Sequence, residues 1–406
     1  MPKLRHIFSR LPWRAISSVL VAFVITRAMV FTVTYLSLSE LPLRSGEYWR
    51  VMPKNLIADG LVRWDSGYYL DIVQNGYQTT QEGRYAVFFP FYSMLVWVVY
   101  HLFGHLYLSG LWVSNLMFLI ALGYLYALTY QEYGEAIAGR AVFYLAAAPA
   151  AFIFSAFYTD STLLAFVIAC FYYARNRHWG LAALTGAAAS ATQVTGFLVA
   201  VFMVLEGLYQ QGAVFLPRPW SWKAQWSLIQ KDIQLIPRAF TSLMAAVGTM
   251  AGWLTFMVYE QRVFGDPLAF IHNHVIWGNQ LSWDWLPRLI QNTTFRLNVG
   301  SDLLAGQINV NFLQDVAATL IFLPLVIAVL FKMRPSYAWF TLLMYLVAPI
   351  SANLESMRRF VLWLVPCYML MGVWGKRQWV DRLILGFSFC LQTYMTILFT
   401  HWYFGA

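Results

Sequence analysis

Long apolar runs separated by short polar intervals occupy most of the chain. A helix needs about 20 apolar residues to cross a bilayer, and Ala15 to Leu38 is the first run of this length. The run 180–209 exceeds one crossing and is interrupted by Gly186, Gly196 and a polar stretch, so we expect two short helices there. With this run counted twice, the pattern predicts about eleven transmembrane helices, from the runs 15–38, 106–130, 141–157, 163–173, 180–209, 243–259, 312–331, 337–350, 360–374 and 383–403.

The shorter apolar run at 88–103 decides the topology. If it crosses the membrane, the basic clusters 175–177 and 218–238 lie outside. Because Lys and Arg concentrate in cytoplasmic loops, we instead expect 88–103 to be a reentrant or interfacial helix. The basic N-terminus is then a cytoplasmic tail before a retained span, because no cleavage pattern follows it.

This topology predicts a single transmembrane domain over residues 1–406. Its first external loop is 39–105, and its second external loop is 261–311. The segment 210–240 is amphipathic and basic, which is typical of a helix on the cytoplasmic lipid surface.

Composition supports a membrane protein and excludes several other classes. The chain is 60% hydrophobic and 11% charged, whereas soluble domains carry about 25% charged residues. The net charge of +9 is distributed in short clusters between apolar runs, which argues against a nucleic-acid partner. Three cysteines (Cys170, Cys367 and Cys390) lie inside apolar runs without metal-ligand spacing, and no glycine-rich phosphate loop is present, so we expect no metal and no cofactor.

The best candidate for chemistry is the polar stretch 63–92 in the first external loop. Asp65 stands where a helix could begin, so it is either an N-cap or a reactive carboxylate, and Asp160 presents the same two alternatives. Acids and arginines recur in the expected external loops at Asp65, Asp71, Asp160, Glu355, Arg63, Arg84, Arg358 and Arg359. This combination suits sugar transfer from a lipid phosphate, since a carboxylate takes the acceptor proton and a guanidinium holds the phosphate.

Several motifs resemble the phosphatidylinositol-glycan class V family, the mannosyltransferases that add the second mannose in glycosylphosphatidylinositol (GPI) anchor assembly, together with their prokaryotic relatives. The specific part is the segment Trp64-Asp65, Tyr69, Ile72, Gly76-Tyr77 and Phe88-Phe89-Pro90. Supporting parts are Arg27, SAFYTDS at 155–161, SATQVTG at 190–196, the stretch 269–277, and Arg358-Arg359 before Pro366. One departure is Gln193, where the family often carries an arginine.

The resemblance implies the GT-C architecture, an α-helical bundle with juxtamembrane helices in the first external loop. It also implies inverting mannose transfer from a polyprenyl-phosphate mannose to an extracytoplasmic glycolipid or glycan. The family's essential acid corresponds to Asp65. A compact chain favours a prokaryotic, monomeric member in the plasma membrane, working on the extracytoplasmic face (the luminal face of the endoplasmic reticulum in a eukaryote).

We therefore predict catalytic roles for Asp65 and Asp160, and phosphate contacts for Arg358, Arg359 and Arg63. The expected walls of the substrate site are Trp64, Tyr69, Trp277 and Gln280. The alternative is a transporter or lipid flippase in which Arg27 and the broken helix at 180–209 form a path at the bilayer midplane. Transporters usually show internal repeats and midplane acids, and the sequence contains neither.

Overall fold

The computed structural model describes residues 13–44, 50–79, 83–213, 234–278, 283–297 and 309–403, and within these ranges it is helical without a strand. Five stretches of the described chain are long and apolar enough to cross a membrane. They are α2 (Trp13–Glu40), α6 (Leu106–Tyr133), Ile236–Val263, α17 (Val310–Lys332) and α21 (Gln378–Thr400). The expected all-α membrane bundle is confirmed, and the number eleven stays a prediction.

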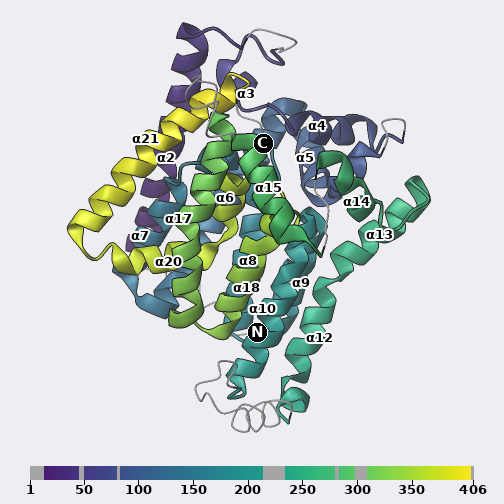
Figure 1. Ribbon diagram of the computed structural model, residues 1–406, viewed down its shortest axis with the longest axis vertical. Coiled ribbons are helices and arrows are strands. Elements are labelled where there is room, and N and C mark those ends of the chain that lie inside the picture. The colour runs from purple at the N-terminus through teal and green to yellow at the C-terminus, as the bar shows by residue number, and fades with distance from the viewer. Residues whose placement is uncertain are drawn as a thin grey trace.

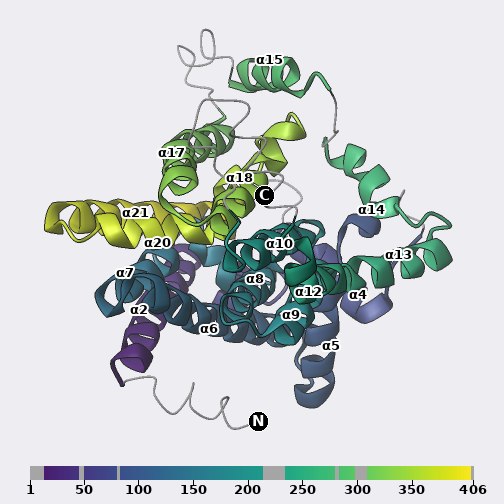
Figure 2. The same cartoon turned by 90° about the horizontal axis from the view of Figure 1, so that it is seen from below.

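Shorter helices complete the bundle, and Figures 1 and 2 show how they pack around its centre. Helix α8 packs against α6 and α9, α12 packs against α9 and α10, and α18 packs against α10 and α17. The bounds of these shorter helices are α7 (Glu135–Ala146), α8 (Asp160–Arg175), α9 (Trp179–Thr192), α10 (Val199–Gln210), α12 (Phe240–Thr249), α13 (Ala251–Val263), α18 (Pro335–Ile350) and α20 (Val365–Trp374).

The remaining short helices are α3 (Leu56–Gly60), α4 (Ser66–Asn75), α5 (Pro90–Phe103), α14 (Ala269–His272), α15 (Trp285–Leu297) and α19 (Met357–Phe360). Helices α3 and α4 lie at the upper end of the bundle in Figure 1. Pro90 opens α5, and Gly104 ends it with a φ of 75°. Its 14 residues are shorter than a bilayer crossing, and the expected reentrant or interfacial placement stays a prediction.

The helix break expected within 180–209 is present. Helix α9 ends at Thr192, and Gln193 is extended before a 3-10 turn (η3, Val194–Leu198) leads into α10. A Cβ atom on Gly196 would lie 2.0 Å from the carbonyl oxygen of Ala189, so the break requires glycine at this position.

A second break separates α7 from α8, and Arg27 of α2 stabilises it. The buried Arg27 guanidinium donates to the carbonyl oxygens of Ala146 (3.2 Å) and Ala151 (2.9 Å) and to Ser155 Oγ (3.0 Å). These bonds satisfy carbonyls that the interrupted helix leaves without partners. Arg27 is thus bonded to protein, which gives no support to a transport path along it.

Charged side chains join the bundle at the end of α8 opposite Asp160. Arg175, the last residue of α8, lies 2.6 Å from Glu132 and 2.9 Å from Glu206, and Arg334 lies 3.7 Å from both acids. The network connects α6, α8, α10 and the start of α18. Most of the expected amphipathic segment at 210–240 falls outside the described residues.

Candidate active site

Three helix ends bring two carboxylates and one guanidinium together. Asp65 is the N-cap of α4, Asp160 is the first residue of α8, and Arg359 lies in α19. Arg359 Nη1 is 3.1 Å from Asp65 Oδ2, and Arg359 Nε is 3.0 Å from Asp160 Oδ1. Both predicted acids and one predicted arginine therefore form a single cluster, the Asp65–Arg359–Asp160 triad.

Exposure distinguishes the two acids of the triad. The Asp160 side chain is fully buried, whereas 18% of the Asp65 side chain and 8% of the Arg359 side chain remain exposed. Asp160 is therefore enclosed with Arg359, and Asp65 is the more accessible of the two acids.

Aromatic side chains enclose the triad. The ring centroid of Tyr158 lies 5.0 Å from Arg359 Cζ, within cation–π range, and Trp363 lies on the same guanidinium at 6.0 Å. The Tyr158 hydroxyl also accepts the backbone N–H of Asp65 at 3.1 Å. Tyr69, a predicted wall residue, is buried against Tyr158, and its hydroxyl lies 3.3 Å from Thr159 Oγ1.

The backbone at Trp64 is in the left-handed region, with a φ of 55°. This conformation is costly for a bulky residue and persists only where surrounding contacts enforce it. The Trp64 ring packs edge-on against Trp402 at 5.4 Å, while the adjoining Asp65 N–H is held by Tyr158. These two contacts fix the turn that carries Asp65.

Electrostatics favour a basic carboxylate at Asp65. Burial raises the pKa of Asp65 above its usual value and outweighs the lowering by Arg359, and the nearby charge of Asp160 raises this pKa further. A carboxylate with a raised pKa is a stronger proton acceptor once it is ionised, which is the property that a general base requires.

Two predicted phosphate contacts have other partners in the structure. Arg63 Nη2 lies 2.6 Å from Asp59 Oδ2, and both side chains are fully buried, so the Arg63 guanidinium has no face that a lipid phosphate can reach. Arg358 is also buried and turns toward Asp315 of α17, with 3.4 Å between Nε and Oδ1. Of the three arginines predicted to contact the phosphate, only Arg359 pairs with Asp65 and Asp160.

The remaining predicted wall residue that the structure describes is Trp277, which joins an aromatic cluster beside α4. Its ring contacts Tyr68 at 5.4 Å and Phe88 at 5.9 Å, and Tyr68 stacks on Phe88 at 4.7 Å. Gln280 lies outside the described residues. The sequence pattern predicted no role for Tyr158, although it lies within the motif at 155–161, or for Trp363, which no motif marked.

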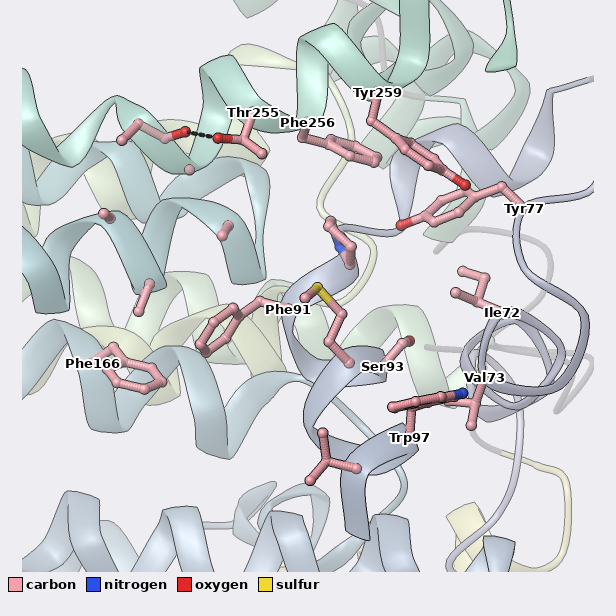
Figure 3. Close-up of a pocket in the computed structure, with 18 of the residues that line it drawn as sticks. Ile72, Val73, Tyr77, Phe91, Ser93, Trp97, Phe166, Thr255, Phe256 and Tyr259 are labelled. Atoms are coloured by element: carbon pink, nitrogen blue, oxygen red, sulfur yellow. Dashed lines mark hydrogen bonds between the residues drawn. The ribbon is translucent and has the colours of Figure 1, made fainter. Parts of the chain in front are cut away.

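An apolar pocket of about 850 Å³ lies on the other side of α4. Helices α4, α5, α9 and α13 contribute its walls, and small residues such as Ala188 and Gly252 leave the space open. In Figure 3, Tyr77 and Tyr259 point toward one another at one side of the pocket, and Phe91 and Phe166 lie at the other. Ile72 and Val73 of α4 line it, so one short helix borders both the triad and the pocket.

No group of three or more His, Cys, Asp or Glu side chains that could hold a metal occurs in the part of the chain that the structure describes. The triad combines two carboxylates with one guanidinium, and the predicted catalytic roles of Asp65 and Asp160 stay predictions.

Comparison with solved structures shows a similar fold. The fold is similar to that of ArnT from Cupriavidus metallidurans bound to undecaprenyl phosphate, with 14% identity, a TM-score of 0.50, and coverage of 94% of this chain and 76% of that one. The archaeal oligosaccharyltransferase AglB from Archaeoglobus fulgidus, in complex with an inhibitory peptide and a dolichol-phosphate, gives 15% identity, a TM-score of 0.43, and coverage of 96% and 56%. The similarity to ArnT confirms the expected GT-C fold.

The family follows from the sequence. A family model described as Mannosyltransferase (PIG-V) matches residues 10–259, more than half of the chain, and the protein belongs to this family. Asp65 and Asp160 fall inside the matched range, and Arg359 follows it. A comparison with curated proteins found no match.

Proposed function

We propose that the protein transfers mannose from a polyprenyl-phosphate mannose to a hydroxyl of a glycolipid or glycan at the extracytoplasmic face. The observation that carries the proposal is the partly exposed Asp65 carboxylate, which is paired with Arg359 in a member of a mannosyltransferase family. Asp160 holds Arg359 from its other side.

In the proposed reaction, Asp65 takes the proton of the acceptor hydroxyl as its oxygen attacks C1 of the mannose. The bond between C1 and the phosphate oxygen breaks, and the polyprenyl phosphate leaves with the electron pair. A single displacement of this kind inverts the configuration at C1. When Asp65 becomes protonated, Arg359 loses one anionic partner and is available to the charge that develops on the phosphate.

The apolar pocket suits the hydrocarbon chain of the donor. Its lining is almost entirely apolar, and it shares α4 with the triad, so a lipid held there keeps its phosphate near the Asp65 end of that helix. Pockets of this size and character are typical of ligand sites.

The distribution of basic residues supports the proposed face. Arg175 and Arg334 lie at the end of the bundle opposite the triad, and the positive-inside rule places that end in the cytoplasm. The triad then lies on the outer side, at the plasma membrane of a prokaryotic cell.

The direct test is Asp65→Asn. Purified variant and wild-type protein are assayed with radiolabelled polyprenyl-phosphate mannose and a membrane lipid extract as acceptor. Loss of the general base is expected to lower transfer by about 10²–10⁴-fold. The matched control is Asp71→Asn, which removes another carboxylate of α4 that bonds to Asn75 instead of Arg359. Transfer by Asp65→Asn at the wild-type rate would remove Asp65 from the mechanism.

A further inference from the structure

Arg358 and Arg359 are neighbours in α19, but they point to different partners. Consecutive residues of an α-helix are rotated by about 100°, so both side chains cannot face one site. Arg359 reaches the two acids, whereas Arg358 Nη1 donates to the carbonyl oxygen of Asn311 at 3.1 Å and to Gln314 Oε1 at 2.9 Å. The direction of Arg359 therefore depends on how this single helical turn is rotated.

Asp315 of α17 fixes that rotation. Its buried carboxylate accepts the backbone N–H groups of Arg358 at 3.0 Å and of Ser356 at 3.3 Å. The first N–H groups of a helix have no partner within the helix, and here a carboxylate from another helix supplies it. The loop before α19 is strained, with φ values of 68° at Ser356 and 57° at Ala352, so it needs such an anchor.

We propose that Asp315 and Arg358 form a positioning pair that aims Arg359 at Asp65 and Asp160. This inference rests on the proposed function, and it assigns a role to a residue that no motif marked. Asp315 has no direct part in the chemistry and acts through α19.

The experiment compares Asp315→Asn and the double variant Asp315→Asn/Arg358→Gln with the control Asn309→Ala. Asn309 caps the same helix α17 by accepting the N–H of Phe312 at 3.1 Å, at the start of the helix. Each protein is purified in detergent, checked for a single folded species, and assayed for kcat and KM. Misplacing a catalytic group by about 1 Å can cost about 10²-fold in rate, and this is the expected loss in kcat for both Asp315 variants, with wild-type kcat in the control.

A second readout separates positioning from general stability. Arg359 lowers the pKa of Asp65, so a misplaced Arg359 shifts the acid limb of kcat/KM to higher pH. The other groups that act on or face Asp65 are Asp160, Glu355, Tyr69 and Tyr158. The pH dependence of Asp65 modification by a carbodiimide, followed by mass spectrometry, reports the same shift without turnover.

The outcomes are distinct. No transfer by wild-type protein contradicts the proposed function, and the carbodiimide shift still tests the positioning pair. An unchanged acid limb and an unchanged Asp65 reactivity in Asp315→Asn overturn the inference, as does a loss of kcat no greater than that of Asn309→Ala. If Asp315→Asn does not fold because the buried Arg358 charge has lost its carboxylate partner, the double variant removes that charge and carries the test.

Discussion

At the scale of single residues, the site depends on unequal burial of two similar acids. Asp160 has lost all contact with solvent and pairs with the cation Arg359, whereas Asp65 keeps part of its surface. Burial without a cation would leave two adjacent carboxylates protonated at neutral pH. Arg359 thus permits an ionised base in a mostly apolar setting.

This balance predicts the pH dependence of the reaction. Asp65 accepts a proton only when it is ionised, and burial raises its pKa, so kcat/KM should fall as the pH drops through a value above the ordinary carboxylate range. Arg359→Gln removes the group that lowers this pKa, and its acid limb should lie at higher pH than in the wild type. The measurement is kcat/KM against pH.

A suitable control for this prediction is Arg140→Gln, which removes a partly exposed arginine paired with Asp381 in other helices. Its acid limb should match that of the wild type. A limb that stays in place or moves to lower pH in Arg359→Gln would show that another group governs the profile.

At the scale of helices, close packing behind the triad positions Tyr158. A Cβ atom on Gly110 of α6 would lie 2.0 Å from the ring of Phe157, which directly precedes Tyr158. Gly110→Ala should therefore displace Phe157 and, with it, the Tyr158 hydroxyl that holds the Asp65 N–H. We expect a loss of about 1–3 kcal/mol in stability from overpacking, and a lower kcat.

Thermal unfolding in detergent and single-turnover transfer measure these two effects. Gly123→Ala on the same helix is the control, because its Cβ would meet no atom within 4 Å. Equal behaviour of the two variants would mean that the packing at Gly110 does not support the site.

The helices themselves were largely predictable from the sequence, and the partners of the arginines were not. Apolar runs and the break before Gly196 follow from local composition, although Gly186 lies inside α9 and does not interrupt it. The start of α5 at Pro90 follows from the chemistry of proline. By contrast, Arg359 and Asp160 are 199 residues apart in the sequence. No local signal indicates which of the two adjacent arginines contacts Asp160. The rotation of α19 is set by Asp315 on a different helix, which is information that only the packed structure contains.

At the scale of the whole molecule, the two ends of the bundle carry different charged clusters. One end carries the ion pairs of Arg175 and Arg334, and the other carries the triad and the short helices α3 and α4. Labelling single cysteines in intact cells tests this polarity. In a Cys390→Ser background, which removes the exposed cysteine, Gly67→Cys should react with a membrane-impermeant maleimide.

The opposite result is expected for Gln378→Cys, at the start of α21, which should react only after the cells are permeabilised. Both positions are exposed, so a difference in reactivity reports the side of the membrane instead of burial. Reversed labelling would place the triad in the cytoplasm and contradict the proposed face.

The three residues of the triad are far apart in the sequence, and this distance has a consequence for biogenesis. Ribosomes make Asp65 and Asp160 long before Arg359, so the nascent protein enters the membrane with two acids whose cation has not yet been synthesised. Buried acids without a cation are costly, so the incomplete bundle should stay loosely assembled until α19 arrives. A chain truncated before residue 351 should consequently be cleared by membrane proteases faster than the full-length protein, and pulse-chase labelling of the two would measure this.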